Sequence, residues 1–122
     1  MNVQKPNNRP ERVGHEILHI LGDVTTKYID ITHLGFITFT NCQVTPDLKL
    51  VKIYFSVLSP TKEIKIIERE LNRLRKAFRK YLGQQLHIRN TPDITFIYDN
   101  SIEEANRINE LFAKLNLDKD DL

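Results

Sequence analysis

Apolar residues recur every three or four positions in three stretches of the chain. The first stretch runs from Arg9 or Pro10 to about residues 28–30, the second covers residues 62–82, and the third lies toward the carboxyl end. The apolar positions that set these periods are Val13, Ile17, Ile20, Leu21, Val24 and Tyr28, then Ile64, Ile67, Leu71, Leu74, Phe78 and Tyr81, and finally Ile102, Ala105, Ile108, Leu111, Phe112 and Leu115. Residues at this spacing lie on one face of a helix, so each stretch predicts an amphipathic helix whose apolar face is buried.

Polar residues and one glycine mark the expected helix ends. Ser59 or Thr61 is positioned to cap the middle helix, and residues 99–101 to cap the last one, because their side-chain oxygens can accept hydrogen bonds from free backbone amides. Gly83 is expected to end or bend the middle helix.

Alternating and β-branched residues predict three strands. Residues 36–40 are rich in β-forming residues, residues 48–58 alternate between apolar and polar, and residues 94–98 form the last strand. The short turn at residues 45–47 predicts an antiparallel hairpin, with a β-bulge near Thr40 or Asn41 that returns the later apolar residues to the inner face. The order predicts an α+β domain with helices on one face of the sheet.

Length and composition favour one domain. With 122 residues, about 40% of them hydrophobic, the chain is long enough for one core. We expect a flexible amino terminus at 1–8, a single domain at 9–116 and a short acidic tail at 117–122. The absence of a long apolar run or signal-peptide segment in this sequence predicts a cytoplasmic protein, in which the single Cys42 is a small core residue instead of a redox or metal group.

The middle helix carries a lengthwise stripe of cations, although the whole chain has a net charge of only +2. The stripe consists of Lys62, Lys65, Arg69, Arg73, Lys76 and Lys80. Like charges at this spacing repel by roughly 0.2–0.5 kcal/mol per pair. One explanation of the stripe is that this helix face is exposed to water and binds no partner. A stripe of one sign, however, favours an anionic partner, in the first place nucleic acid. Arg75, Arg79 and Arg89 join these six as candidate RNA-binding residues, and for Arg89 a structural role is an equal alternative.

A zinc-protease motif in the first helix is interpreted as coincidental. Residues 15–19 read HEILH, which matches H-E-x-x-H. His15 and His19 fall opposite the apolar stripe, and the position of a third ligand in the longer motif is held by Thr25. Two solvent-facing histidines do not make a catalytic zinc site, so we expect no metal and no other cofactor.

Four segments resemble a known family when read together and in this order. They are RPERV at 9–13, GFIT at 35–38 with VTPDL at 44–48, VKIYFS at 51–56, and LHIRNTPDITF at 86–96 followed by YD at 98–99. They resemble ribosome-binding factor A, a family of bacterial small-subunit assembly factors, across residues 9–115. The resemblance implies a KH-like type II fold, α-β-β-α-α-β, with an additional C-terminal helix. It also implies binding to the small (30S) ribosomal subunit and its 16S rRNA or precursor, in support of late maturation, rRNA processing and growth in the cold.

One segment departs from the family pattern. The family usually has an Ala-x-Gly kink between its two middle helices, where this chain has Leu74-Arg75-Lys76. Because no helix breaker is present, local sequence predicts a nearly continuous helix with at most a modest bend. The chain also lacks the Gly-x-x-Gly loop of ordinary KH domains, so recognition is expected to depend on phosphates and RNA shape.

A non-enzymatic, monomeric partner of the small subunit is therefore the leading hypothesis. The alternatives are a KH-like RNA-binding module that acts in translation or RNA processing away from the ribosome, and a domain that binds an acidic protein. Asp47, Asp93 and Asp99 offer no catalytic arrangement, and their positions beside Pro, Asn or Ser suggest turn and cap residues.

Overall fold

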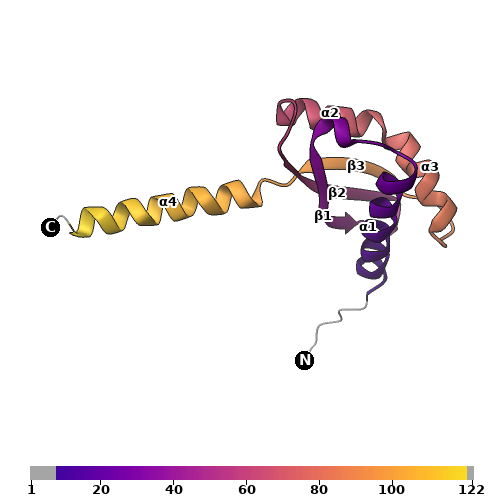
Figure 1. Ribbon diagram of the computed structural model, residues 1–122. Coiled ribbons are helices and arrows are strands. Elements are labelled where there is room, and N and C mark those ends of the chain that lie inside the picture. The colour runs from indigo at the N-terminus through magenta and orange to yellow at the C-terminus, as the bar shows by residue number, and fades with distance from the viewer. Residues whose placement is uncertain (1–7, 121–122) are drawn as a thin grey trace.

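The computed structural model describes residues 8–120. Figure 1 shows a three-stranded sheet with helices against it and one helix that extends away. The elements in chain order are α1 (Arg9–Lys27), a short 3-10 helix η1 (Thr32–Leu34), β1 (Phe36–Val44), β2 (Leu50–Leu58), α2 (Ile64–Arg73), α3 (Arg75–Gln85), β3 (Asp93–Tyr98) and α4 (Ser101–Asp120). The predicted flexible terminus lies outside the described residues except for Asn8, whose side chain accepts a hydrogen bond from the Glu11 amide at 2.9 Å and so caps α1.

The sheet has the order β1-β2-β3 and is mixed. β1 and β2 pair antiparallel, which confirms the predicted hairpin, and β2 and β3 pair parallel. The register shifts between Phe39 and Asn41, so the predicted bulge is present. As a result Cys42 and Val44 return to the side of Ile37 and Phe39 and pack against the core.

The first three α-helices cover one face of the sheet, which confirms the predicted α+β layers. α1 lies against β1 and α3, whereas α2 and α3 lie against β3. The core is made of aliphatic side chains and phenylalanines; its largest fully buried members are Phe55, Phe78, Phe96, Ile17, Leu21, Leu34, Ile53, Ile67, Leu71, Leu82, Val24 and Val51. The expected core role of Cys42 is consistent with its half-buried position, where loss of solvent raises the pKa of its thiol to about 12.

The boundaries of the middle helices differ from the prediction in three ways. α2 begins at Ile64 without a side-chain cap, because the Thr61 hydroxyl instead donates to the carbonyl oxygen of His33 at 2.6 Å. Lys62 therefore precedes the helix. Gly83 does not end the segment, since α3 continues to Gln85.

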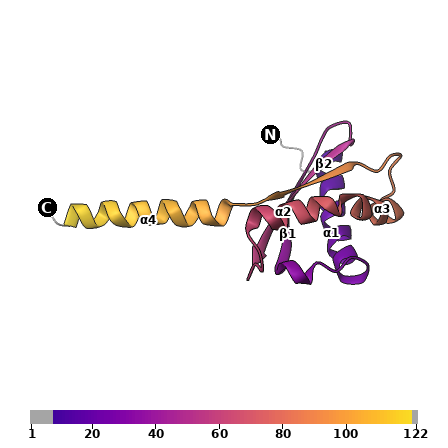
Figure 2. The same ribbon diagram turned by 90° about the horizontal axis from the view of Figure 1, so that it is seen from above.

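The expectation of a nearly continuous middle helix is wrong. Leu74 separates α2 from α3, with φ −89° and ψ 2°, and its amide donates to the carbonyl of Leu71. Figures 1 and 2 show that the two helices are distinct segments over the same side of the sheet. The family's kink is thus retained without a glycine, and none of the residues at this break has a positive φ. Tertiary contacts on both sides of Leu74, described below, outweigh helix propensity here.

Two predicted apolar faces are not buried as expected. Tyr28 closes α1 and is 54% exposed, although the periodicity placed it with the buried face. α4 projects away from the sheet (Figure 2), and its large apolar residues Ile102, Ile108, Leu111, Phe112 and Leu115 are exposed. α4 also continues to Asp120, so the helix extends past the boundary at residue 117 where the acidic tail was expected to begin.

Candidate nucleic-acid interface

The free edge of β3 is held by polar side chains from α2. The Asn72 amide group donates to the carbonyl oxygen of Phe96 at 2.9 Å, and its oxygen accepts from the Phe96 amide at 2.8 Å. Two residues farther along β3, the Tyr98 amide donates to the Glu68 carboxylate at 2.8 Å. These bonds satisfy edge groups that no strand pairs, and they fix the direction of α2 along β3.

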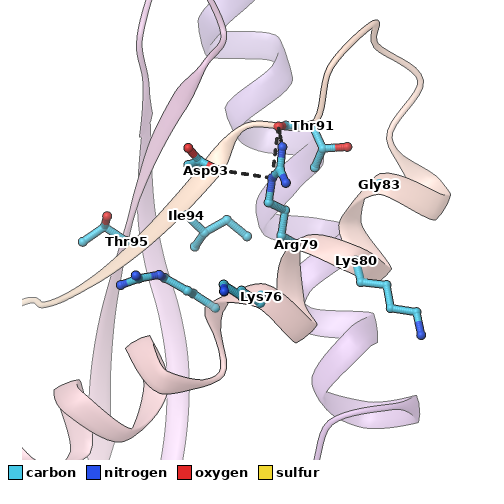
Figure 3. Close-up of a pocket in the computed structure, with 9 residues that line it drawn as sticks. Lys76, Arg79, Lys80, Gly83, Thr91, Asp93, Ile94 and Thr95 are labelled. Atoms are coloured by element: carbon cyan, nitrogen blue, oxygen red, sulfur yellow. Dashed lines mark hydrogen bonds and ion pairs between the residues drawn. The ribbon is translucent and has the colours of Figure 1, made fainter.

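α3 is attached to the other end of β3. The Arg79 guanidinium donates to the carbonyl oxygen of Thr91 at 2.9 Å and lies 3.3 Å from the Asp93 carboxylate. Figure 3 shows the Arg79 side chain directed at both partners. Gly83 permits the close approach, because a Cβ at this position would lie 2.7 Å from the Thr91 hydroxyl. The two helices are therefore held separately on β3, with the break at Leu74 between their attachments.

Two hollows meet at this break and are lined by cations. The larger, which we call the β3 hollow, has a volume of about 660 Å³ and is lined by Arg75, Lys76, Arg79, Lys80, Gly83, Thr91, Asp93, Ile94 and Thr95. The smaller, the break hollow, has a volume of about 410 Å³ and is lined by Arg69, Asn72, Arg73, Arg75 and Lys76. Arg75 and Lys76 line both hollows, so the helix break sits at the centre of a continuous basic region.

We name this region the α2–α3 surface. Its residues are Arg69, Arg73, Arg75, Lys76, Arg79 and Lys80. All six are exposed. Within the part of the chain that the structure describes, Arg73 pairs with Glu70 at 3.4 Å and Arg79 with Asp93, while no carboxylate lies within ion-pair distance of the other four. Unneutralised guanidinium and ammonium groups of this kind attract phosphates.

The remaining candidate cations lie at or beyond the margins of the α2–α3 surface. Lys62 is 4.0 Å from Glu70, and exposed Lys65 lines neither of the two hollows. Arg89 lies apart, in a hollow of about 170 Å³ that it shares with Arg9 and Lys49. The structure therefore gathers most of the predicted RNA-binding residues and separates Arg89 from them.

The carboxylates considered in the sequence have structural partners. Asp47 accepts from the Thr45 hydroxyl at 2.6 Å in the hairpin turn, and Asp99 accepts from the Ser101 amide at 2.9 Å at the start of α4. These hydrogen bonds hold the pKa of both carboxyl groups below its usual range. Asp93 is not a turn residue; it opens β3 and pairs with Arg79.

The histidines of the zinc-protease motif face solvent. His15 is exposed, and His19, with an 82% exposed side chain, lies 3.9 Å from Asp23 one turn along α1. Among residues 8–116 no group of three or more His, Cys, Asp or Glu side chains is placed to hold a metal ion. Within residues 8–120 no helix is both long and apolar enough to cross a membrane.

Comparison with known proteins decides the family. The family model described as ribosome-binding factor A matches residues 9–112. The chain belongs to the ribosome-binding factor A family. Ribosome-binding factor A of Staphylococcus carnosus is 36% identical over 107 residues, which cover 88% of this chain and 93% of the relative. The Geotalea daltonii protein is 34% identical over 107 residues, covering 88% of this chain and 87% of the relative.

Structures of ribosome-binding factor A proteins share the fold. The solution structure of a putative ribosome-binding factor A from Thermotoga maritima has a TM-score of 0.64 at 25% identity and covers 83% of this chain and 96% of its own. The Thermus thermophilus crystal structure has a TM-score of 0.63 at 15% identity, covering 75% of this chain and 97% of its own. A homology model of the Thermus thermophilus protein, fitted into a cryo-EM map of its complex with 30S, has a TM-score of 0.57 at 15% identity and covers 71% and 91%.

Several residues that build the site were not identified from sequence. Asn72 was available as a signal, because asparagine is a poor helix-interior residue that competes for backbone groups. Glu68 lies among the cations of the middle helix with no sequence signal of its role, yet its carboxylate accepts a hydrogen bond from the Tyr98 amide. The pairing of Gly83 with Thr91 had no local signal, since it depends on how the loop before β3 returns to α3.

Proposed function

We propose that this chain binds the small (30S) ribosomal subunit through its 16S rRNA and supports late maturation of that subunit. The observation that carries the proposal is the α2–α3 surface, where cations without carboxylate partners surround two hollows at the helix break. Membership of the ribosome-binding factor A family, together with the 30S complex described for the Thermus thermophilus protein, supports the small subunit as the partner.

In this proposal the chain catalyses no reaction, and it recognises RNA by its phosphates and its shape. Arg79, Asp93 and Thr91 hold α3 against β3, so the neighbouring cations are presented on a rigid base. The sheet and the first three α-helices form one hydrophobic core within a single chain, which supports action as a monomer. The expected place of action is the cytoplasm. Processing of precursor 16S rRNA and growth in the cold would then depend on this binding.

Neutralising the α2–α3 surface tests the proposal. Replacement of Arg69, Arg73, Lys76 and Lys80 by Gln removes four positive charges from it. A matched control replaces Arg12, Lys52, Arg107 and Lys114 by Gln; these four are exposed and lie on α1, β2 and α4. Binding is measured by co-sedimentation with purified small subunits across a range of salt concentrations, and folding by the thermal midpoint.

The two variants should separate clearly. The α2–α3 variant should bind small subunits more weakly at every salt concentration, with a salt dependence flatter by roughly 0.7–0.9 log units per log salt for each phosphate that it no longer binds. Its thermal midpoint should stay unchanged or rise slightly as like-charge repulsion falls. Wild-type affinity in this variant, or an equal loss in the control, would refute the assigned surface. Binding to free RNA but not to subunits would favour a module that acts away from the ribosome.

A further inference from the structure

Tyr28 presents an exposed aromatic ring that is supported from behind. Its ring stacks on that of Tyr81 from α3, with centroids 4.6 Å apart and planes inclined by 6°. Tyr81 covers one face of the Tyr28 ring, yet the residue remains 54% exposed at the end of α1. A flat ring held in this way loses little freedom when a second planar group stacks on it.

The tyrosine pair adjoins the α2–α3 surface. The Lys80 ammonium lies 5.8 Å from the centroid of the Tyr81 ring, and Lys80 also lines the β3 hollow. Figure 3 shows the Lys80 side chain directed away from Arg79 and Asp93, toward the outside of that hollow. One lysine therefore connects a phosphate-attracting surface to an aromatic stack.

A separate hollow opens beside the exposed ring. It has a volume of about 570 Å³ and is lined by the end of α1, by η1 and by the beginning of β1, including Tyr28 and Phe36. Phe36 is 69% exposed, so two accessible aromatic rings share this hollow. Such rings suit a planar, largely apolar ligand.

The polar groups of this hollow give it no net charge to attract a phosphate. Its charged side chains are Lys27 and Asp30, which are of opposite sign. The Thr25 and Thr26 hydroxyls already donate to the carbonyl of Gly22, at 2.9 and 3.1 Å. Asp30 accepts from both the hydroxyl and the amide of Thr32, and these bonds hold its pKa below the usual range. A neutral base can therefore enter the hollow, whereas Lys80 can bind the phosphate outside it.

We propose that Tyr28 is a stacking platform for an unpaired nucleobase of the RNA that contacts the α2–α3 surface. The inference rests on the proposed function and adds a base contact to it. Because every base has a π-face, the platform selects unpaired over paired RNA without reading sequence. Because Lys80 adjoins Tyr81 and Tyr81 stacks on Tyr28, a strand whose phosphate contacts Lys80 passes close to this platform.

The test compares two oligomers of equal length and charge, an oligouridylate and an abasic ribose-phosphate chain. Wild-type protein should bind the oligouridylate about 5- to 150-fold more tightly, the range expected for a single stacked base. Tyr28→Phe should keep this preference, because it keeps the aromatic face. Tyr28→Leu keeps apolar contact with Tyr81 but should lose the preference, with unchanged affinity for the abasic chain. Its thermal midpoint should fall only slightly, because it loses the ring stacking on Tyr81 and no core contact.

The outcomes distinguish the platform from the function on which it rests. Equal affinity of the wild type for both oligomers, no binding of either, or a preference that survives in Tyr28→Leu would overturn the platform. In each case the co-sedimentation of the α2–α3 variant with small subunits still decides the proposed function independently.

Discussion

Removal of the Asn72 side chain is expected to loosen both the fold and the α2–α3 surface. Asn72 makes two hydrogen bonds with the backbone of Phe96 and a third with the carbonyl of Glu68. In Asn72→Ala, the Phe96 amide and carbonyl lose their partners on a half-buried strand edge. Taking about 1–1.5 kcal/mol for each gives a loss of about 2–3 kcal/mol, from which the better helix propensity of Ala recovers roughly 0.5 kcal/mol.

The expected net effect is a decrease of about 2 kcal/mol in the free energy of unfolding, or about 6–12 °C in the thermal midpoint. Urea unfolding measures it: the midpoint should fall while the slope of free energy against urea concentration stays constant. Asn106→Ala is the control, because Asn106 is exposed on α4 and its side chain has no hydrogen bond to the described residues. A decrease in the free energy of unfolding of less than about 0.5 kcal/mol in Asn72→Ala would refute the stabilising role of its hydrogen bonds to β3.

Binding provides a second readout for the same variant. Asn72 lines the break hollow with Arg73, Arg75 and Lys76. If the hydrogen bonds of Asn72 to β3 position these cations, Asn72→Ala should weaken binding to small subunits even though it changes no charge. Unchanged affinity in a destabilised variant would show that the break is structural and does not position the RNA contacts.

Three further predictions use other parts of the structure. Gly83→Ala should lower the free energy of unfolding by about 1 kcal/mol, because the added Cβ would lie 2.7 Å from the Thr91 hydroxyl. Gly22→Ala should raise the free energy of unfolding by about 0.5–1 kcal/mol, because nothing lies within 4 Å of the added Cβ. Urea unfolding measures both changes, and reversed signs would contradict these expectations. Cys42, whose thiol pKa is raised to about 12 by partial burial, should react with a thiol reagent at pH 8 much more slowly in the folded chain than after unfolding, and equal rates would contradict its place against the core. Because Asp99 has a lowered pKa, its stabilising contribution is present above about pH 4 and lost below it, so acidification should destabilise the wild type more than Asp99→Asn; parallel pH profiles would count against this capping role.

The spacing of apolar residues predicted the layers of this fold, because the layers form where apolar faces of helices and strands are buried against one another. The helical period placed Ile67, Leu71 and Phe78 in the core, and the alternation along β2 did the same for Ile53 and Phe55. The bulge was predictable as well, since without it the later apolar residues of β1 would face solvent. These features follow from residues close together in sequence.

The break at Leu74 could not be predicted from local propensity, because its causes lie elsewhere in the chain. Asn72 acts on Phe96, and Arg79 acts on Thr91 and Asp93, across separations that helix propensity does not consider. The apolar seam continues through Leu74, which is why the segment resembled one helix. The resemblance to the family indicated a kink here, but the prediction followed local propensity and was wrong.

The candidate site was predicted in composition but not in shape. The cations of the stripe are exposed as expected, yet Lys62 precedes α2 and Arg89 lies in another hollow. Tyr28 was assigned to the buried face because its spacing fits, but the end of α1 carries it past the core and onto Tyr81. Spacing identifies a face of a helix, whereas exposure at a helix end depends on what lies beyond it.

Crosslinking of the wild-type chain to small ribosomal subunits, with the crosslinked peptides and nucleotides mapped, tests the central claim most directly. We expect crosslinks from the α2–α3 surface to 16S rRNA, concentrated around the helix break at Arg75 and Lys76. RNA crosslinks confined to α4 or to the uncovered face of the sheet, with none in residues 69–80, would contradict it.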